Sequence, residues 1–296
     1  MNVVFLNDFA ELNIRYRSRF ISYLRNSSIQ VYSLGWFDRW WSFAFIFSLC
    51  FFRGFVFFSS NLRSNILSLL FLNRGLVILN GLGRYRGSVL FRRFLIFLVK
   101  YRSKRKFILV QNYADFRWLR FRTKSRNVFW CPGSGGVVRP HSLDDCFLVV
   151  SRPDKLCVQS KHIESFISVF KVPLNIVGVS PDYGELFHEP TVDICFCGYL
   201  PQEDIFKFGS RLFHPSGYGE GIPHVVVDAI VSGMEVVITK KQFVEFGFHR
   251  LSIVHSNFES YVICSAPKES ISGLESEVIV SIYSGFLTKV FNGEMA

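Results

Sequence analysis

The chain has 296 residues and a net charge of +11, a length that suits two domains of ordinary size. Its seven cysteines are odd in number and form no Cys-x-x-Cys pair, so they argue against a disulfide framework or a cysteine metal site. Buried, reduced thiols in a cytosolic protein fit them better. The sequence also contains no Walker loop, nucleophile elbow or internal repeat.

The two halves of the chain differ in charge. Residues 1–140 contain 23 basic and 4 acidic side chains, a net charge of +19, whereas residues 141–296 contain 11 and 19, a net charge of −8. This break supports two domains joined near residue 140. It also predicts that the first half approaches something anionic, for which lipid headgroups, a lipid diphosphate acceptor and nucleic acid are all candidates.

Short apolar runs alternate with helical patterns through the first half. The runs predict strands, and the helical patterns include 14–24 and 88–99, so the order indicates a parallel, Rossmann-like sheet. Residues 40–58 are apolar enough to suggest a membrane span, but Arg53-Gly54 interrupts them, which favours a buried or interfacial helix followed by a strand. The predicted strands are 3–6, 29–34, 55–58, 76–79, 107–110 and 128–130.

Two loops in this half follow strands and precede helices, where ligands of such sheets bind. The first contains Gly81-Leu82-Gly83, although a tight turn without a ligand would need the same glycines. The second is Gln111-Asn112-Tyr113-Ala114-Asp115. Both loops are therefore candidates for one wall of a binding site.

The densest basic run is Lys100–Lys106, and Arg92, Arg93 and the cluster 117–126 add to it. Because this half is also rich in Phe and Trp, we favour a surface that binds anionic lipids over a nucleic-acid patch. A basic face that is merely solvated remains an alternative.

The glycine-rich segment Cys131–Val137 coincides with the charge break and predicts an interdomain linker. It gives domain boundaries of 1–138 and 139–296. The second half contains further predicted strands and a long terminal helix. These strands are 146–150, 174–177, 194–197, 212–214, 236–239 and 252–255, and the helix is 274–291.

The segment His214–Pro223 joins a short strand to a helix that is predicted to begin near Pro223. Its glycines allow close backbone approach, and the helix N-terminus attracts phosphate. Glu220 in the turn and Asp228 in the helix can accept hydrogen bonds from hydroxyls. The pattern indicates a site for a phosphorylated, hydroxyl-rich ligand, but an ordinary strand-loop-helix unit with two solvated acids has the same spacing.

The string Pro-Ser-x-x-x-Glu-Gly-x-Pro, with an acid eight positions after the Glu and then Ala-x-x-x-Gly, resembles the nucleotide-sugar motif of the retaining family-four glycosyltransferases. The Gly-Leu-Gly, Gln-Asn-x-x-Asp and Pro-Gly-Ser-Gly segments are similar to loops of the same family. The second acid of the motif is Asp here, where the family has Glu.

The resemblance implies a GT-B fold, an α/β architecture with two Rossmann-like domains facing across a cleft, and helix 274–291 packing back toward the first domain. It implies that Glu220 is the catalytic acid that contacts the donor sugar and that Asp228 binds the ribose. Arg152 and Lys155 would bind the donor diphosphate, with Lys161 as the alternative lysine. The remaining implied contacts are the donor-side backbone of Gly219, Gly221 and Ile222, and the acceptor-side cleft residues Gly81, Gly83 and Asn112.

The activity implied is transfer of a hexose from a nucleoside-diphosphate sugar to a glycan or lipid-linked acceptor, with retention, in the biosynthesis of O-antigen, capsule or lipopolysaccharide. The absence of Asp-x-Asp and His-Glu-x-x-His motifs predicts a metal-independent reaction with no cofactor beyond the donor. No cleavable signal peptide is expected, so the predicted location is the inner face of the cell membrane. A non-catalytic membrane-surface or scaffold protein of the same fold, and a nucleic-acid-binding protein, are the alternatives.

Overall fold

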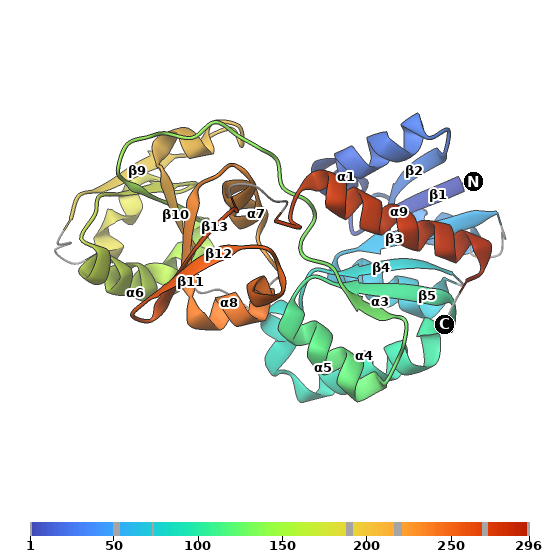
Figure 1. The fold of residues 1–296 in the computed structure, drawn as a ribbon. Coiled ribbons are helices and arrows are strands. Elements are labelled where there is room, and N and C mark those ends of the chain that lie inside the picture. The colour runs from blue at the N-terminus through green and yellow to red at the C-terminus, as the bar shows by residue number, and fades with distance from the viewer. Residues whose placement is uncertain are drawn as a thin grey trace. The chain divides into compact units, whose positions relative to one another are not determined.

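The computed structural model describes residues 2–49, 54–72, 74–187, 192–215, 221–267 and 272–294. The chain forms two compact units (Figure 1). Unit 1 comprises Met1–Gly135, Gly219–Ile222 and Ser276–Ala296, and unit 2 comprises Gly136–Tyr218 and Pro223–Glu275.

The sheet of unit 1 has six parallel strands. They are β1 (Asn2–Asn7), β2 (Gln30–Gly35), β3 (Phe55–Ser60), β4 (Gly75–Leu79), β5 (Lys106–Val110) and β6 (Val128–Trp130). Their order is β2-β1-β3-β4-β5-β6, and every neighbouring pair is parallel. The inner strands are continuous apolar runs because helices cover both faces. Strand order reverses between β1 and β3, so that point is the expected ligand crevice of the sheet.

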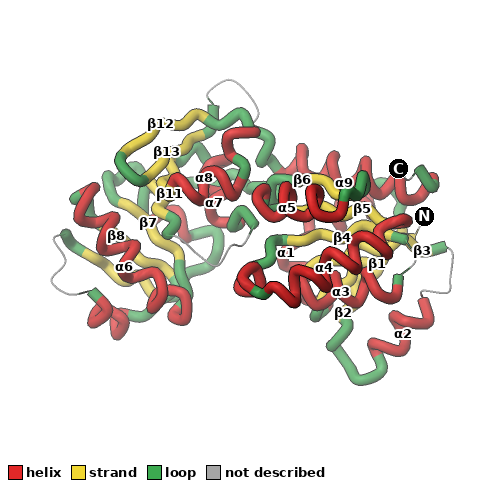
Figure 2. The backbone as a smooth tube through the Cα atoms, turned by 90° about the horizontal axis from the view of Figure 1, so that it is seen from below, coloured by secondary structure: helices red, strands yellow, loops and turns green. Residues whose placement is uncertain are grey.

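Helices cover the two faces of this sheet (Figure 2). Phe5 and Phe58 pack with helices α1 and α9 on one face, whereas Val77 and Ile108 pack with α3, α4 and α5 on the other. Helix α2 extends the second layer, because its Phe43 contacts a phenylalanine of α3. The helices are α1 (Ala10–Asn26), α2 (Ser42–Leu49), α3 (Leu62–Phe71), α4 (Val89–Arg102), α5 (Tyr113–Thr123) and α9 (Ser276–Asn292), with the short 3-10 helices η1 (Gly83–Gly87) and η2 (Ser103–Arg105).

The sheet of unit 2 has seven strands, which are β7 (Phe147–Val150), β8 (Leu174–Val177), β9 (Ile194–Gly198), β10 (Arg211–Phe213), β11 (Glu235–Thr239), β12 (Val254–Phe258) and β13 (Tyr261–Ser265). Their order is β12-β13-β11-β10-β7-β8-β9. The five strands from β11 to β9 are parallel, and β13 and β12 continue the sheet in antiparallel fashion. The order reverses between β7 and β10, which makes the carboxyl ends of these two strands the expected ligand crevice.

The helices of unit 2 are α6 (Pro153–Phe170), α7 (His224–Val231) and α8 (Lys240–Phe246), with 3-10 helices η3 (Pro181–Leu186), η4 (Ile205–Phe208) and η5 (Phe248–Arg250). Helix α6 buries Leu156, Ile163 and Phe166 against the sheet, where the Phe166 ring stacks on that of Phe213 at 3.8 Å between centroids. Strands β12 and β13 form a hairpin, of which the predicted strand 252–255 covers only a part. The rest was missed because β12 is exposed at every position and carries no buried apolar pattern.

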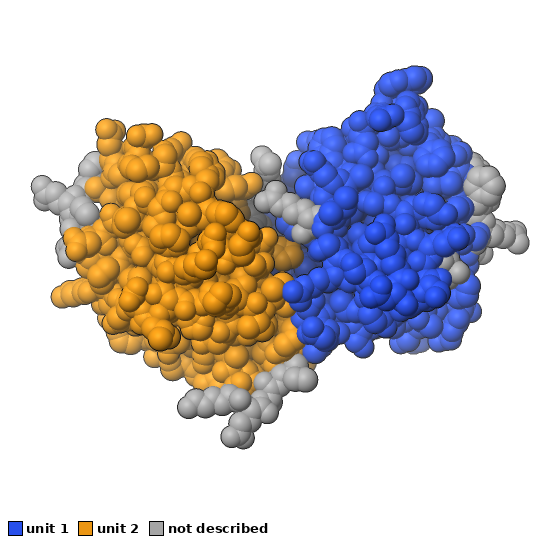
Figure 3. All heavy atoms as spheres, turned by 90° about the horizontal axis from the view of Figure 1, so that it is seen from above, with its two compact units in different colours: residues 1–135, 219–222, 276–296 blue, residues 136–218, 223–275 orange. Residues whose placement is uncertain are grey.

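Figure 3 colours the two units separately; the first boundary along the chain lies in the glycine-rich segment, between Gly135 and Gly136. Gly136 packs so closely on α7 that a Cβ atom would lie 2.8 Å from the Val231 side chain. After this boundary the chain builds unit 2, and α9 then completes the core of unit 1 with Ile279, Tyr283 and Leu287.

The apolar stretch 40–58 contains helix α2 and strand β3, with Cys50–Arg53 outside the described residues. Ile46 of α2 is buried, as is most of β3. Within the described ranges, no helix is both long enough and apolar enough to cross a membrane. The interpretation as a helix followed by a strand is therefore confirmed.

Candidate functional site

Polar side chains gather at the strand reversal of unit 1. Asn7 ends β1, and its amide oxygen accepts hydrogen bonds from the backbone N–H of Asp8 at 2.8 Å and from the side chain of Asn61. The Asn7 amide nitrogen donates to the Ser60 hydroxyl at 3.0 Å. Asn61 has φ 71° and ψ 148°, a conformation that non-glycine residues rarely adopt. Hydrogen-bonded polar side chains therefore line the carboxyl ends of β1 and β3, where the ligand crevice is expected.

Asp8 is the acidic residue of this crevice. Its Oδ1 accepts from the backbone N–H of Ser64 at 3.1 Å. Burial raises the pKa of the Asp8 carboxyl above its usual range, and the Ser64 hydrogen bond and the positive charge of Arg63 offset only part of that rise. The carboxyl group is only half-buried, so it combines a perturbed pKa with access to solvent.

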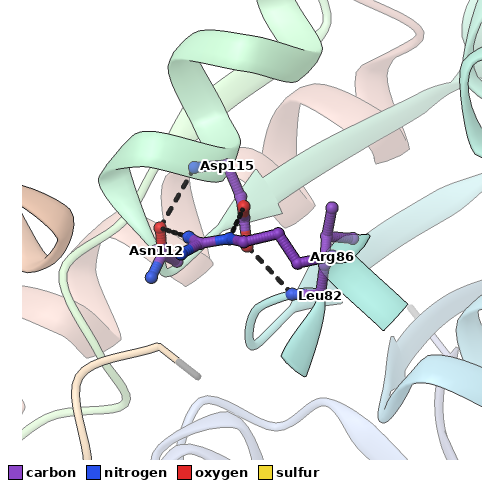
Figure 4. Close-up of polar contacts among 4 residues, drawn as sticks. All are labelled: Leu82, Arg86, Asn112 and Asp115. Carbon is purple, nitrogen blue, oxygen red and sulfur yellow. Dashed lines mark hydrogen bonds and ion pairs between the residues drawn. The ribbon is translucent and has the colours of Figure 1, made fainter. Parts of the chain in front are cut away.

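The loop after β4 contains both glycines that were predicted to face the ligand. Gly81 has φ 144° and Gly83 has φ 52°, which turns the chain tightly between β4 and η1. In this turn the backbone N–H of Leu82 donates to Asp115 Oδ2 at 2.9 Å (Figure 4). The two glycines therefore position the loop against the start of α5.

Asn112 and Arg86 complete this constellation. Asn112 is fully buried and caps α5, since its Oδ1 accepts from the backbone N–H of Asp115 at 3.0 Å. Arg86 donates to the same Asn112 oxygen at 2.9 Å and to Asp115 Oδ1 at 2.9 Å (Figure 4). The Asp115 side chain is 6% exposed and that of Arg86 28%, so the ion pair is largely shielded from water. These contacts give Asn112 a structural role, and its predicted acceptor role remains a prediction.

Gly221 and Ile222 lie in unit 1, at the carboxyl ends of β4 and β5. A Cβ atom on Gly221 would be 2.1 Å from the Asn80 carbonyl oxygen and 3.0 Å from the Gln111 Cβ. Only glycine fits this contact. Ile222 is buried at 5% exposure. Glu220 and Gly219 of the same motif lie outside the described residues.

Arg152 and Lys155 lie at the strand reversal of unit 2. Arg152 follows β7 and is the N-cap residue of the 18-residue helix α6, with Pro153 at the first helical position. The neighbouring parallel strand β10 leads into His214, which starts the motif loop. The Arg152 guanidinium is mostly exposed and lies 3.6 Å from the Asp154 carboxylate. A cation at a helix N-terminus beside a strand reversal suits a diphosphate.

Asp228 is buried in α7 and makes two contacts with the segment after Gly136. Its Oδ2 accepts from Arg139 Nε at 3.1 Å, and its Oδ1 accepts from the backbone N–H of Val137 at 2.9 Å. Ser232, one turn later, accepts from the backbone N–H of Arg139 at 2.8 Å. The predicted helix start shifts by one residue, because α7 begins at His224 and Pro223 is its N-cap.

Three residues with clear structural roles in these sites were not identified from the sequence: Arg86, Arg139 and Asn61. The partners of Arg86 and Asn61 are 26 to 54 residues away, and those of Arg139 are 89 and 93 residues away. No short-range pattern in the sequence indicates contacts between residues so far apart. Asp8 did carry a signal, since an acid directly after the first strand of a parallel sheet is at the ligand edge.

No protein-family model matches the sequence, and no curated protein sequence does either. Solved structures of the Anabaena protein Alr3699/HepE are similar. Its complex with UDP matches with a TM-score of 0.56 and 14% identity over 98% of this chain and 90% of that chain. Its complex with UDP and glucose matches with a TM-score of 0.59 and 12% identity over 98% and 92%.

The complex of the same protein with UDP-glucose matches with a TM-score of 0.58 and 13% identity, covering 99% of this chain and 91% of that chain. The alignment thus includes both sheets, each dominated by parallel strands and flanked by helices. The predicted α/β architecture with two Rossmann-like sheets is confirmed, and the chain has the GT-B fold.

Proposed function

We propose that the chain is a glycosyltransferase that moves a sugar from a nucleoside-diphosphate sugar to an acceptor. The observation that carries this proposal is the fold similarity over nearly the whole chain to a protein solved with UDP and UDP-glucose. The strand reversal of unit 2 supports it independently. Arg152 lies there beside the strand that leads into the glycine-rich motif loop.

The donor diphosphate would bind at the start of α6. The N-terminal end of this helix carries the partial positive charge of the helix dipole, and Arg152 and Lys155 add two cations. The same charges would stabilise the nucleoside diphosphate as it departs, which is the kind of electrostatic contribution that dominates such reactions. Glu220 would accept hydrogen bonds from the donor sugar, with the backbone of Gly219, Gly221 and Ile222 beside it.

Asp228 is proposed to contact the ribose. A carboxylate only accepts hydrogen bonds, and the two hydroxyl groups of a ribose need such an acceptor. The ion pair with Arg139 would then fix the orientation of the carboxylate before the nucleotide arrives.

The finer assignments follow the motif resemblance. We propose transfer of a hexose with retention, without a metal ion or a cofactor other than the donor. The acceptor would be a glycan or a lipid-linked glycan of O-antigen, capsule or lipopolysaccharide biosynthesis, handled at the inner face of the cell membrane. Gly81, Gly83 and Asn112 would form the acceptor side.

A transfer assay tests the proposal. The chain is incubated with UDP- and GDP-sugars and membrane extract as acceptor, and release of nucleoside diphosphate is followed together with labelled product. The variant Glu220→Gln should abolish transfer, while Glu235→Gln, which removes an exposed acid of β11, should not. Full activity of Glu220→Gln would refute the assigned role.

The same assay examines the finer assignments. Product recovered from a donor of known anomeric configuration is analysed by NMR, and inversion at the anomeric carbon would overturn retention. Activity that disappears with a chelator and returns with a divalent cation would overturn metal independence.

A further inference from the structure

Helix α4 carries apolar side chains both on its core-facing side and on its exposed side. Its inner face packs Leu95, Leu98 and Val99 into the core of unit 1. Its outer face carries a stripe at helical spacing whose side chains are well exposed. The stripe consists of Leu90 (81% exposed), Phe94 (40%), Phe97 (56%) and Tyr101 (58%). An outward apolar stripe on a helix that is already anchored in a core marks an interaction surface.

Exposed cations accompany this stripe. Arg93 and Lys100 lie on the same outer face of α4, and Lys104 follows its end. Helix α5 lies beside α4, because Arg92 places its guanidinium carbon 4.4 Å from the ring centroid of Trp118. The outer face of α5 adds Phe121, which is 77% exposed, together with several exposed arginines. These exposed residues of α4, α5 and Lys104 are called the α4–α5 surface.

The charge of this surface has one sign. Residues 89–126 contain twelve lysines and arginines and a single acid, Asp115, which is buried and paired with Arg86. The partner of the surface must therefore be anionic, and it must also offer apolar material to the exposed stripe. A second copy of the same face would be repelled.

We propose that the α4–α5 surface binds an anionic lipid bilayer, with its cations on the headgroups and its apolar stripe at the boundary with the acyl chains. Aromatic and basic residues also bind single-stranded nucleic acid, where the rings stack on bases. The most exposed residue of the stripe, Leu90 at 81%, and the neighbouring Val89 at 62% have no aromatic ring to stack and instead suit hydrocarbon.

Helix α2 supports this choice from the same side of the sheet. It packs beside α3 through Phe43 and Phe47, whose rings contact Phe71, and α3 in turn packs beside α4. The turn before α2 exposes Trp40 to 93% and Trp41 to 43%. Tryptophan is enriched where a protein meets the interfacial zone of a bilayer.

Vesicle co-sedimentation tests the proposal, with phosphatidylcholine vesicles made with and without phosphatidylglycerol. No sugar donor is added, so the result does not depend on glycosyl transfer. The wild-type chain should sediment with the anionic vesicles and be released by salt. Reversal of three charges, Arg93→Glu, Lys100→Glu and Lys104→Glu together, should weaken partition at least about tenfold. Replacement of Leu90, Phe94 and Phe97 by Ser should weaken it several-fold.

Matched controls lie on the opposite face of the same sheet, on α1 and α9. The charge control reverses Arg19, Arg25 and Lys289 together, and the apolar control replaces Ile14, Tyr23 and Phe291 by Ser; all six are exposed. Circular dichroism and the thermal midpoint establish that each variant is folded. The controls should retain vesicle binding.

Three results would overturn the proposal. The folded wild-type chain could fail to bind anionic vesicles, or the two α4–α5 variants could bind them as well as their controls. The third is a reversed preference, in which the α4–α5 variants lose binding to single-stranded RNA but keep binding to vesicles.

Discussion

Arg139 and Asp228 form a partly buried ion pair, with 3.1 Å between Nε and Oδ2 and side-chain exposures of 16% and 4%. Asp228 also accepts from the backbone N–H of Val137 at 2.9 Å. One carboxylate therefore fastens the segment after the glycine-rich boundary to helix α7. If Asp228 also binds the ribose, as we propose, the same carboxylate both anchors this segment and takes part in the donor site.

We predict that Arg139→Gln lowers the free energy of unfolding by about 2–3 kcal/mol, because it removes a cation that pairs with the buried Asp228 carboxylate. Asp228→Asn should cost less, since the amide oxygen can still accept from Val137. Urea unfolding followed by fluorescence measures both changes.

The control is Lys207→Gln, which removes an exposed ion pair with Asp204 in unit 2 and should leave the free energy of unfolding nearly unchanged. If Arg139→Gln is no more destabilising than Lys207→Gln, the ion pair does not anchor the segment.

Asp8 should make stability depend on pH. Its folded-state pKa is raised, chiefly by burial, so its favourable contribution is complete below the unfolded-state pKa and is lost as pH rises through the folded-state pKa. Asp8→Asn should therefore match the wild type in acid and be more stable near neutral pH. Urea midpoints across this range test it, with exposed Asp193→Asn as the control for removing one charge. A variant that is destabilised at neutral pH would contradict the sign.

Gly221 should not tolerate a side chain. A Cβ atom there would lie 2.1 Å from the Asn80 carbonyl oxygen, so Gly221→Ala must displace the loop, and we expect a loss of about 1–3 kcal/mol. Gly285→Ala is the control, because nothing lies within 4 Å of a Cβ at that position in helix α9. The control should stabilise by up to about 1 kcal/mol. Equal thermal midpoints for the two variants would show that the contact is not fixed in solution.

Arg86 should hold the two loops at the carboxyl ends of β4 and β5 together. Arg86→Met removes the hydrogen bonds that Arg86 donates to Asn112 and Asp115, including the charge pair with the buried Asp115 carboxylate. We expect a loss of about 2–3 kcal/mol in unfolding free energy. Hydrogen exchange should also speed up at Leu82, whose N–H bonds to Asp115. Unchanged exchange at Leu82 would argue against a shared constellation.

Most of the sheets could be predicted from the sequence, because buried parallel strands are short apolar runs such as 76–79 and 107–110. Strand β12 lacks that signal, since none of its residues is buried. Helix α3 was not assigned individually. Its buried face includes Ser64, Asn65 and Ser68, which does not produce an apolar period.

The candidate site was predictable where a local motif carries it. Gly81, Gly83 and Arg152 lie at carboxyl ends of strands, as their positions between strand and helix indicated. The pairings that hold the site were not predictable. Arg139 reaches Asp228 across 89 positions, and only the folded chain brings them together.

Calorimetric titration with nucleoside diphosphates decides whether the chain is a nucleotide-sugar glycosyltransferase. We predict that the wild-type chain binds UDP or GDP, and that Arg152→Ala with Lys155→Ala weakens binding at least about tenfold by removing two cations from the diphosphate. The exposed pair Lys241→Ala and Arg250→Ala, also in unit 2, should leave affinity unchanged. If the folded chain binds no nucleoside diphosphate, it is not a nucleotide-sugar glycosyltransferase.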